Sequence, residues 1–337
     1  MIPSPMGESR ARTEFIEVVR EMKTIQAPRA STILYNFLTS QKNERPWLLP
    51  ANICPIVPIT FMKARVPLEF VDISARTLHM DLDRAQGRIK NRDFGGILYA
   101  HSYGEESTPE DFFALAKTHN PETLIVDDRC LCIPDFDVSS SADVVLFSTG
   151  YAKIVDLEYG GYAYIREEVD YHPVHLPFDP SSLAQLEQEY KSAVRDRTGF
   201  NYQDREWLAT DLEMPHWAEY RKQIETGLKS SLRQRERLNA IYASRLPAEI
   251  QLPREYQNWR FNIRVMDQRR VLESIFSAGL FASSHYASLA GIMAEGIAPQ
   301  AEVLAAEVVN LFNDHHFDEE KAEQVCDTVL DQLRGLS

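Results

Sequence analysis

The sequence predicts an α/β protein with a mostly parallel central sheet between helices, followed by a small C-terminal α+β domain. Short apolar runs alternate with helix-compatible stretches over the first half of the chain, which is typical of a parallel sheet covered on both faces. A long polar helix and a mixture of strands and helices follow. At 337 residues the chain can bury a large core. We expect a large domain over residues 1–240, with an N-terminal helix, and a small domain over residues 241–337.

The elements expected in the large domain follow in chain order. A surface helix is expected at 13–23 from apolar residues at helical spacing, and another helix opens at Ala30. The strands of the sheet are expected at 47–51, 68–72, 95–101, 123–127, 142–147 and 162–165. The helices between them are expected at 56–63, 82–90 and 109–119. Pro55 and Pro58 suit the first turn of the helix at 56–63, where a missing N–H costs little.

The second half is expected to begin with a charged, irregular segment that contains one helix, 182–195. A long helix at 217–246 carries its charge on a solvated face. The elements expected after it are a strand at 260–265, a helix at 271–278, a strand or turn at 281–286, and helices at 302–310 and 318–333. Gly279 is a typical signal for the end of a helix.

Composition and charge narrow the class of protein. The formal net charge is −14 at pH 7 and the pI is near 5.2, which argues against nucleic acid or an anionic membrane surface as the main partner. No apolar run approaches the roughly 18 residues of a membrane-spanning helix, and the first residues lack the apolar core of a signal peptide. We therefore expect a cytoplasmic protein.

Cysteine and histidine usage predicts no structural metal. Four cysteines are too few and too scattered for a disulfide framework. The segment Cys130-Leu131-Cys132 lacks the two-residue gap of common zinc pairs. His315-His316 beside Asp314 could bind a metal, but a loop before a helix is the favoured interpretation.

Lys153 lies between two strand-like apolar runs and follows the small polar turn Ser148-Thr149-Gly150. Such a position falls near the strand ends, where α/β proteins bind ligands. A lysine there can form a Schiff base with a carbonyl, provided that its surroundings help to deprotonate it. For Lys153 taken alone, an exposed loop lysine is the better interpretation.

A second motif upstream shifts the balance. The β-rich run 123–126 leads directly into Asp127-Asp128. Enzymes that use pyridoxal 5'-phosphate (PLP) need a lysine for the Schiff base and a carboxylate that keeps the pyridine nitrogen protonated. A solvated strand end or a helix cap is the alternative for the two aspartates. The carboxylates and Lys153, in this order, together favour a PLP site.

From about residue 30 onward the chain resembles the DegT/DnrJ/EryC1/StrS aminotransferases, the sugar aminotransferase branch of fold-type I PLP enzymes. The resemblance rests on motifs in the family's order: Leu48-Leu49-Pro50-Ala51-Asn52 (LPA), His101-Ser102-Tyr103-Gly104 (H-x-Y-G), Val126-Asp127-Asp128 (I-E-D-A), Ser148 to Lys153 (S-x-x-x-x-K), Gly160-Gly161 (G-G), Gly199-Phe200-Asn201-Tyr202 (G-x-N-Y) and residues 279–286 (G-I-x-x-x-x-H-Y). It implies a fold-type I PLP-transferase and a homodimer with shared active sites.

The resemblance also implies roles for single residues. Lys153 would hold PLP as a Schiff base, Asp128 would pair with the ring nitrogen and Ser148 with the phosphate. Ala30 and Ser31 would cradle the phosphate with the free N–H groups of a helix start, a plain Ser/Thr cap being the alternative.

Further positions are placed near the coenzyme or the substrate by the same resemblance. Asn52 or Cys54 could pack on the ring, and Cys54 as a nucleophile is a weaker alternative. Asn201 would donate to a phosphate across the dimer, with a Gly-Asn turn as the competing interpretation. His285 and Tyr286 would lie near the substrate, with an ordinary packed histidine as the competing interpretation.

The chain departs from the family pattern at three places. An aromatic residue commonly stands where Cys54 aligns, and His or Gln where Leu131 aligns. The family usually has arginine where Gln203 stands, and its loss weakens an anion site by about 1.5–3 kcal/mol if nothing replaces it. Arg205 is the candidate replacement.

The function implied by the resemblance is that of a PLP-dependent aminotransferase. It would move an amino group from an amino acid, by resemblance L-glutamate, to a keto acceptor, by resemblance a nucleotide-linked keto-deoxysugar of amino sugar biosynthesis. Lys153 would act as general base and acid. A sugar dehydratase is the first alternative, but such family members typically carry histidine in place of the lysine. A degenerate, non-catalytic homologue that serves as a binding partner is the second, and the pair Asp128 and Lys153 disfavours it.

Overall fold

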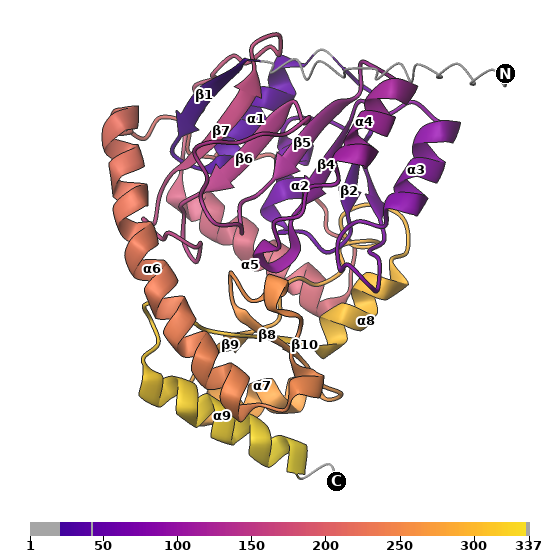
Figure 1. Ribbon diagram of the computed structural model, residues 1–337. Helices are drawn as coiled ribbons and strands as arrows, with labels where there is room; N and C mark the ends of the chain where they lie inside the picture. Colours follow the sequence, from indigo (N-terminus) through magenta and orange to yellow (C-terminus); the bar gives the residue numbers. More distant parts are fainter. Residues whose placement is uncertain (1–20, 42, 335–337) are drawn as a thin grey trace, which may run out of the picture.

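A seven-stranded sheet forms the centre of the larger part of the molecule (Figure 1). The structure is a computed structural model that describes residues 21–41 and 43–334. The strand order is β1-β7-β6-β5-β4-β2-β3. The strands are β1 (Met22–Ala27), β2 (Trp47–Pro50), β3 (Leu68–Val71), β4 (Gly96–Ala100), β5 (Leu124–Asp128), β6 (Val144–Ser148) and β7 (Gly161–Arg166). Strands β2 to β6 pair in parallel, whereas β7 is antiparallel to both of its neighbours.

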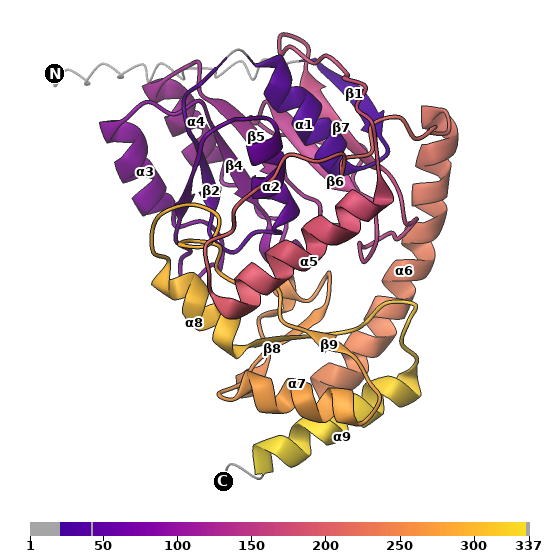
Figure 2. The ribbon, with the colours of Figure 1, turned by 180° about the vertical axis from the view of Figure 1, so that it is seen from behind.

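Helices cover both faces of this sheet. One face packs on α1 (Ala30–Ser40), α2 (Ile56–Lys63) and α5 (Pro180–Asp196), and the other on α3 (Leu82–Asn91) and α4 (Glu110–His119) (Figure 2). Successive strand residues alternate between the two cores: Leu49 and Val126 belong to the first, Leu48 and Ile125 to the second. Burial on both faces explains why these strands are apolar throughout.

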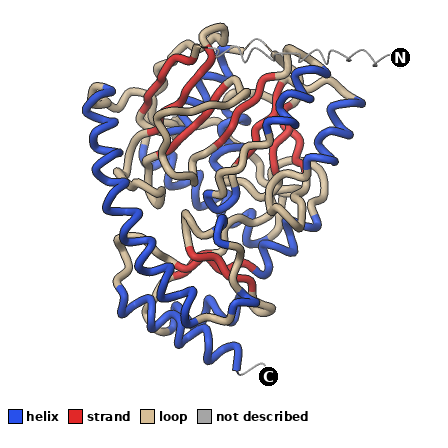
Figure 3. Tube along the Cα trace, viewed as in Figure 1, coloured by secondary structure: helices blue, strands red, loops and turns tan. Residues whose placement is uncertain are grey.

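The C-terminal part is a small α+β unit around a three-stranded antiparallel sheet, visible as the lower red strands in Figure 3. Its strand order is β8-β10-β9, with β8 (Phe261–Arg264), β9 (Ala282–Ser283) and β10 (Val308–Leu311). Helices α7 (Gln268–Ser277) and α9 (Glu319–Arg334) pack on it, and short 3-10 segments at Ala248–Ile250 and Arg254–Tyr256 precede β8. A further 3-10 segment, Ser102–Gly104, follows β4 in the larger part. Helix α8 (Pro299–Glu307) joins this part to the large core, since Asp72 accepts from the N–H groups of Gln300 and Ala301 at 3.1 and 3.0 Å.

Helix α6 (Trp217–Arg245) connects the two parts, with Tyr220 and Ile224 in the large core and Leu238 and Tyr242 in the small one (Figure 1). The expected boundary at residue 240 falls within this helix and stays a prediction. Across the part of the chain that the structure describes, no helix, α6 included, has the length and apolar composition needed to cross a membrane.

The sequence predictions were wrong for some elements. Of the helix expected at 13–23, residues 13–20 lie outside the described residues, while Met22 and Lys23 begin strand β1 because they pair with β7. The helix expected at 302–310 ends at Glu307, and the next four residues form β10, whose valines pair with β8. The strand or turn expected at 281–286 is a strand only over Ala282–Ser283.

Candidate active site

A cavity of about 250 Å³ lies at the carboxyl ends of β2, β4, β5 and β6. Asn52 follows β2, Asp128 ends β5 and Ser148 ends β6, while the start of α1 and Tyr286 from the C-terminal part complete the wall. Parallel α/β sheets bind ligands at this edge, because loops from several strands meet there. The cavity is therefore the first candidate for an active site.

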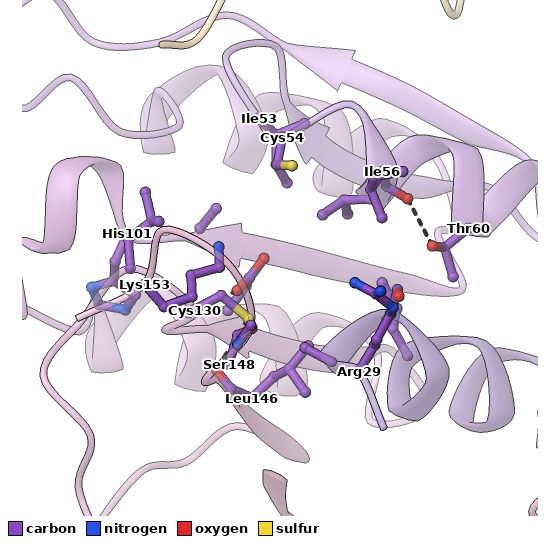
Figure 4. A pocket seen from close by; sticks show the side chains of 18 of the residues that line it. Arg29, Ile53, Cys54, Ile56, Thr60, His101, Cys130, Leu146, Ser148 and Lys153 are labelled. Carbon is purple, nitrogen blue, oxygen red and sulfur yellow. Dashed lines mark hydrogen bonds between the residues drawn. The ribbon is translucent and has the colours of Figure 1, made fainter. Parts of the chain in front are cut away.

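Lys153 projects into this cavity from the loop after β6 (Figure 4). The loop backbone is held tightly: Ala152 has a left-handed φ of 59°, and its N–H donates to Asp156 Oδ2 at 2.8 Å. Trp259 Nε1 donates to the Ala152 carbonyl at 2.7 Å, and Arg235 Nη2 to that of Lys153 at 3.1 Å. No hydrogen bond or ion pair joins Lys153 Nζ to any residue that the structure describes. The arrangement fixes the backbone and leaves the amine available to a ligand.

Asp128 lines the same cavity from the end of β5, the strand that pairs in parallel with β6. Its side chain is buried, and the N–H of Cys130 donates to its Oδ1 at 3.0 Å. This turn leaves the second carboxylate oxygen for a ligand. The structure thus brings Asp128 and Lys153 to one cavity.

The start of α1 forms another wall of the cavity. Ala30 and Ser31 line it, together with Arg29 just before the helix and Ser148 from β6. Arg29 is the N-cap residue and no side chain caps this described end, which speaks against a plain Ser/Thr cap, the alternative interpretation. Uncapped N–H groups and the helix dipole favour an anion at such a terminus.

Close packing of β7 on α1 shapes this end of the cavity. A Cβ added at Gly161 would lie 2.5 Å from the backbone nitrogen of Ala30. Only a glycine allows the strand and the helix terminus to approach so closely. The Gly160-Gly161 motif therefore positions the first turn of α1 against the sheet.

Two residues that line the cavity each carry a buried polar atom without a hydrogen-bond partner among the described residues. The atoms are Oδ1 of Asn52 and the hydroxyl of Tyr103, and the two residues are 6% and 2% exposed. Asn52 is oriented because its Nδ2 donates to the Leu78 carbonyl at 3.1 Å. A buried polar atom without a partner costs about 1–3 kcal/mol, so both atoms point to a polar ligand.

His101 forms a fixed polar wall beside the cavity. Its Nδ1 donates to the Glu105 carbonyl at 2.7 Å, and its Nε2 shares a proton with Asp127 Oδ1, also at 2.7 Å. Asp127 is fully buried and also accepts from Arg129 Nε at 2.8 Å. Next to this network, burial together with His101 lowers the pKa of His79 to about 3, so His79 is neutral.

Two thiols, of Cys54 and Cys130, face the cavity beside the lysine (Figure 4). Burial raises the pKa of both thiols, and that of Cys130 strongly. Neutral thiols are poor nucleophiles, so the geometry gives no support to Cys54 as a nucleophile. Cys54 also occupies the wall where the family resemblance expects an aromatic ring.

Three residues predicted near the site lie outside the cavity wall. Asn201 is exposed beyond the end of α5; since its expected role is across a dimer, it stays a prediction. His285 is exposed, with its ring 5.6 Å from that of Trp259, whereas Tyr286 stacks on Trp259 at 6.2 Å and does line the cavity. Arg205, the candidate for the missing charge, pairs instead with Glu189 at 2.7 Å.

Arg29 was not singled out from the sequence. It lines the cavity at the end formed by the start of α1. Its place directly before a predicted helix was the available signal, because a side chain there can reach the ligand side of the helix terminus.

One group of described residues has a geometry that could converge on a metal ion: Asp314, His315 and His316, whose ligand atoms lie within 4.8 Å of one another. The Asp314 carboxylate is already bound by the Arg260 guanidinium and accepts from the His316 N–H at 3.1 Å. The positive charge of Arg260 opposes a cation there. These residues do not line the cavity that holds Asp128 and the start of α1, although Asp314 and His315 line a second cavity that Lys153 also borders.

Comparison of the fold with known structures decides its class. Helicobacter pylori PseC, an aminotransferase involved in the biosynthesis of pseudoaminic acid, is similar in structure, with a TM-score of 0.68 and 13% sequence identity. The match covers 94% of this chain and 88% of the PseC chain. A DegT DnrJ EryC1 StrS aminotransferase from Brucella abortus matches with a TM-score of 0.65 and 14% sequence identity, over 92% of this chain and 85% of the other. The chain has the fold of the DegT/DnrJ/EryC1/StrS aminotransferases. The predicted fold-type I architecture is thereby confirmed.

A dehydratase structure also matches the fold of this chain. The E. coli GDP-4-keto-6-deoxy-D-mannose-3-dehydratase with bound hydrated PLP matches 91% of this chain and 87% of its own at a TM-score of 0.61 and 13% identity. No family model and no curated protein matches the sequence. The fold alone therefore admits more than one PLP chemistry, and the choice depends on the residues of the cavity.

Proposed function

We propose that the protein is a PLP-dependent aminotransferase. The observation that carries the proposal is the convergence of the Lys153 amine, the Asp128 carboxylate and the uncapped start of α1 on one cavity. PLP presents an aldehyde, a pyridine nitrogen and a phosphate, and these three groups match an amine, a carboxylate and an anion site. The unpartnered atoms of Asn52 and Tyr103 add hydrogen-bonding capacity for such a polar ring. The residues present therefore fit the coenzyme.

Each group of the cavity has a distinct task. Lys153 would hold the coenzyme covalently, and Ser148 with Ala30 and Ser31 would hold its phosphate. When bound, PLP supplies an electron sink for negative charge that develops on the α-carbon of the substrate. Asp128 would keep a proton on the ring nitrogen. Once the amino donor has displaced it from the coenzyme, Lys153 Nζ would take the proton from the α-carbon of the donor and deliver it to the C4′ carbon of the coenzyme, as general base and acid.

The substrates and the assembly form the finer part of the proposal. L-Glutamate would be the amino donor and a nucleotide-linked keto-deoxysugar the acceptor, which the involvement of the similar Helicobacter pylori protein in pseudoaminic acid biosynthesis supports. A cytoplasmic homodimer would let Asn201 reach the partner's coenzyme. Residues 1–240 and 241–337 would move as two domains, with Tyr286 and His285 nearest the substrate.

The visible absorbance of the purified protein with PLP tests this function. A band that forms with wild type but not with Lys153→Ala, and that bleaches on addition of L-glutamate, is the expected result. A band that ignores L-glutamate and other amino acids would contradict the aminotransferase proposal. The absence of a band in wild type would leave a PLP-enzyme scaffold with a non-catalytic role as a binding partner.

Dehydration of a nucleotide sugar is the second candidate, favoured by the similarity to the E. coli dehydratase. Lys153 disfavours it, because family members with that chemistry typically carry histidine there. Transfer of ¹⁵N from labelled glutamate to a keto sugar separates the two candidates. Labelled amino sugar supports the aminotransferase, and loss of water without label supports the dehydratase.

A further inference from the structure

In the proposed function, the end of the cavity at the start of α1 holds the phosphate and needs a positive charge. The family pattern supplies that charge from an arginine in a different segment. Gln203 stands where arginine is usual, and Arg205 is bound to Glu189 at 2.7 Å rather than facing the cavity. Among the described residues that line the cavity, Arg29 and Lys153 are the arginine and lysine side chains. In the proposed function Lys153 forms the covalent bond with the coenzyme, at the other end of the cavity. Arg29 is therefore the available cation.

The backbone of Arg29 is fixed at the entrance to α1. Its extended conformation (φ −148°, ψ 152°) precedes the helix, and its carbonyl accepts from the N–H of Thr32 at 3.0 Å. A parallel bridge joins Arg29 to Gly160, next to the glycine that packs on the helix start. The side chain thus starts from a rigid point beside the first N–H groups of α1.

The Arg29 guanidinium has no hydrogen bond or ion pair with any residue in the described ranges 21–41 and 43–334. The residue is half-buried and lines the cavity. Figure 4 shows Arg29 and Lys153 at opposite ends of the cavity. An arginine that is placed in a ligand cavity without a protein partner is available to an anionic ligand.

We propose that Arg29 binds the phosphate group of the coenzyme and makes the site select phosphorylated over unphosphorylated pyridoxal derivatives. This inference rests on the proposed function, which it extends by one residue that the family motif does not contain. A guanidinium offers a planar pair of donors that matches two phosphate oxygens, and the uncapped helix start adds N–H groups beside it. The buried, unpartnered atoms of Asn52 and Tyr103 indicate independently that this cavity takes a polar ligand.

The test compares pyridoxamine 5'-phosphate with pyridoxamine, because neither forms a covalent bond with Lys153. Binding to the full chain is measured by titration calorimetry for wild type, Arg29→Gln and Arg221→Gln. We expect Arg29→Gln to weaken binding of the phosphorylated ligand by about 10- to 100-fold and to leave the affinity for pyridoxamine within about twofold. Arg221→Gln, which breaks an exposed ion pair with Glu225 on α6 at 2.8 Å, is the matched control and should change neither affinity. Arg29→Lys keeps the positive charge but lacks the planar pair of donors, so it should recover part of the lost affinity for the phosphorylated ligand.

Each other outcome is also decisive. Equal weakening of both ligands, or unchanged binding of the phosphorylated one, would overturn the role of Arg29 while leaving the proposed function intact. An unchanged affinity with a raised KM for the amino donor would assign Arg29 to a substrate carboxylate instead. If wild type binds neither ligand, both this inference and the proposed function fail. If Arg29→Gln does not fold, as seen by circular dichroism, the Arg29→Lys comparison decides.

Discussion

The indole Nε1 of Trp259 donates a hydrogen bond of 2.7 Å to the carbonyl of Ala152, the residue before Lys153. Trp259 is buried and stands just before β8, in the C-terminal part of the chain. Arg235 of α6 donates to the next carbonyl, that of Lys153, at 3.1 Å. Side chains distant in sequence thus fix the backbone on both sides of the Lys153 Cα, and the C-terminal part also contributes Tyr286 to the cavity wall.

We expect Trp259→Phe to loosen this loop. The variant loses the hydrogen bond to Ala152, which holds a left-handed backbone that costs about 1–2 kcal/mol in a non-glycine residue. The free energy of unfolding should fall by about 1 kcal/mol, and the affinity for PLP, measured by absorbance titration, should fall about fivefold or more.

Tyr242→Phe is the matched control for this substitution. It removes a hydrogen bond of the same length, from the Tyr242 hydroxyl to the Phe312 carbonyl, inside the small core. It should lower stability by a similar amount without changing the affinity for PLP. Equal effects of both variants on PLP binding would contradict a specific role for Trp259.

Asp128→Asn is expected to separate coenzyme chemistry from folding. Asparagine keeps the oxygen that accepts from the Cys130 N–H but removes the negative charge. The ring nitrogen then loses its proton, and the transamination rate should fall by about 100-fold or more, since the charge interaction is made with the reacting system. The melting temperature should change little.

Asp127→Asn gives the opposite pattern. Asp127 accepts from both His101 and Arg129 and is fully buried, so its neutralisation removes the charge partner of the Arg129 guanidinium, whose side chain is only 12% exposed. We expect it to lower the free energy of unfolding by about 3 kcal/mol. If the transamination rate falls more in Asp127→Asn than in Asp128→Asn, at temperatures where both variants are folded, then Asp127 rather than Asp128 is the partner of the ring nitrogen.

Most of the fold followed from the sequence because the strands are buried on both faces and read as apolar runs. The helix at Ile56–Lys63 was predicted to the residue, helped by prolines in its first turn. Strand β1 was not predicted, and its first two residues, Met22 and Lys23, were assigned to a helix, because its pairing with β7 is long-range and leaves no local signal. Strand β10 was missed because helix-compatible residues of α8 lead into it without a break.

The candidate site was predictable to a similar extent. Lys153 and Asp128 could be proposed because strand ends collect functional groups and the order of two motifs is informative. Arg29 could not, since its importance depends on the direction of one side chain and on Arg205 being engaged by Glu189. The hydrogen bond from Trp259 to the lysine loop likewise depends on tertiary packing between distant segments.

His79 is expected to make stability depend on pH. Burial, with the help of nearby His101, lowers its pKa from 6.5 to about 3, and Glu105 Oε2 at 3.7 Å is too distant for a hydrogen bond that would offset this. Its contribution to stability is complete above about pH 6.5 and is lost progressively as the pH falls toward 3, because the unfolded chain binds the proton first. The slope is about 1.4 kcal/mol per pH unit for one proton.

Urea denaturation between pH 7 and pH 4 checks this contribution. His79→Gln should flatten the fall in the free energy of unfolding relative to wild type. His175→Gln removes an exposed histidine that pairs with Asp211 on the surface, and it should retain the wild-type slope. The same slope in all three proteins would show that His79 does not remain neutral in the fold.

Two glycine-to-alanine substitutions are expected to have opposite effects on stability: one at the contact between β7 and α1, and one at an open position in α3. In Gly161→Ala the new Cβ would lie 2.5 Å from the Ala30 nitrogen, a backbone atom that cannot move away by a side-chain rotation. The start of α1 must shift, so the free energy of unfolding should fall by about 1–3 kcal/mol, and pyridoxamine 5'-phosphate should bind more weakly. In Gly87→Ala, within α3, nothing lies within 4 Å of the new Cβ, and stability should rise by about 0.5–1 kcal/mol. Denaturation and ligand titration of both variants measure the two effects, and full affinity for the phosphorylated ligand in Gly161→Ala would show that the phosphate does not depend on the position of the helix start.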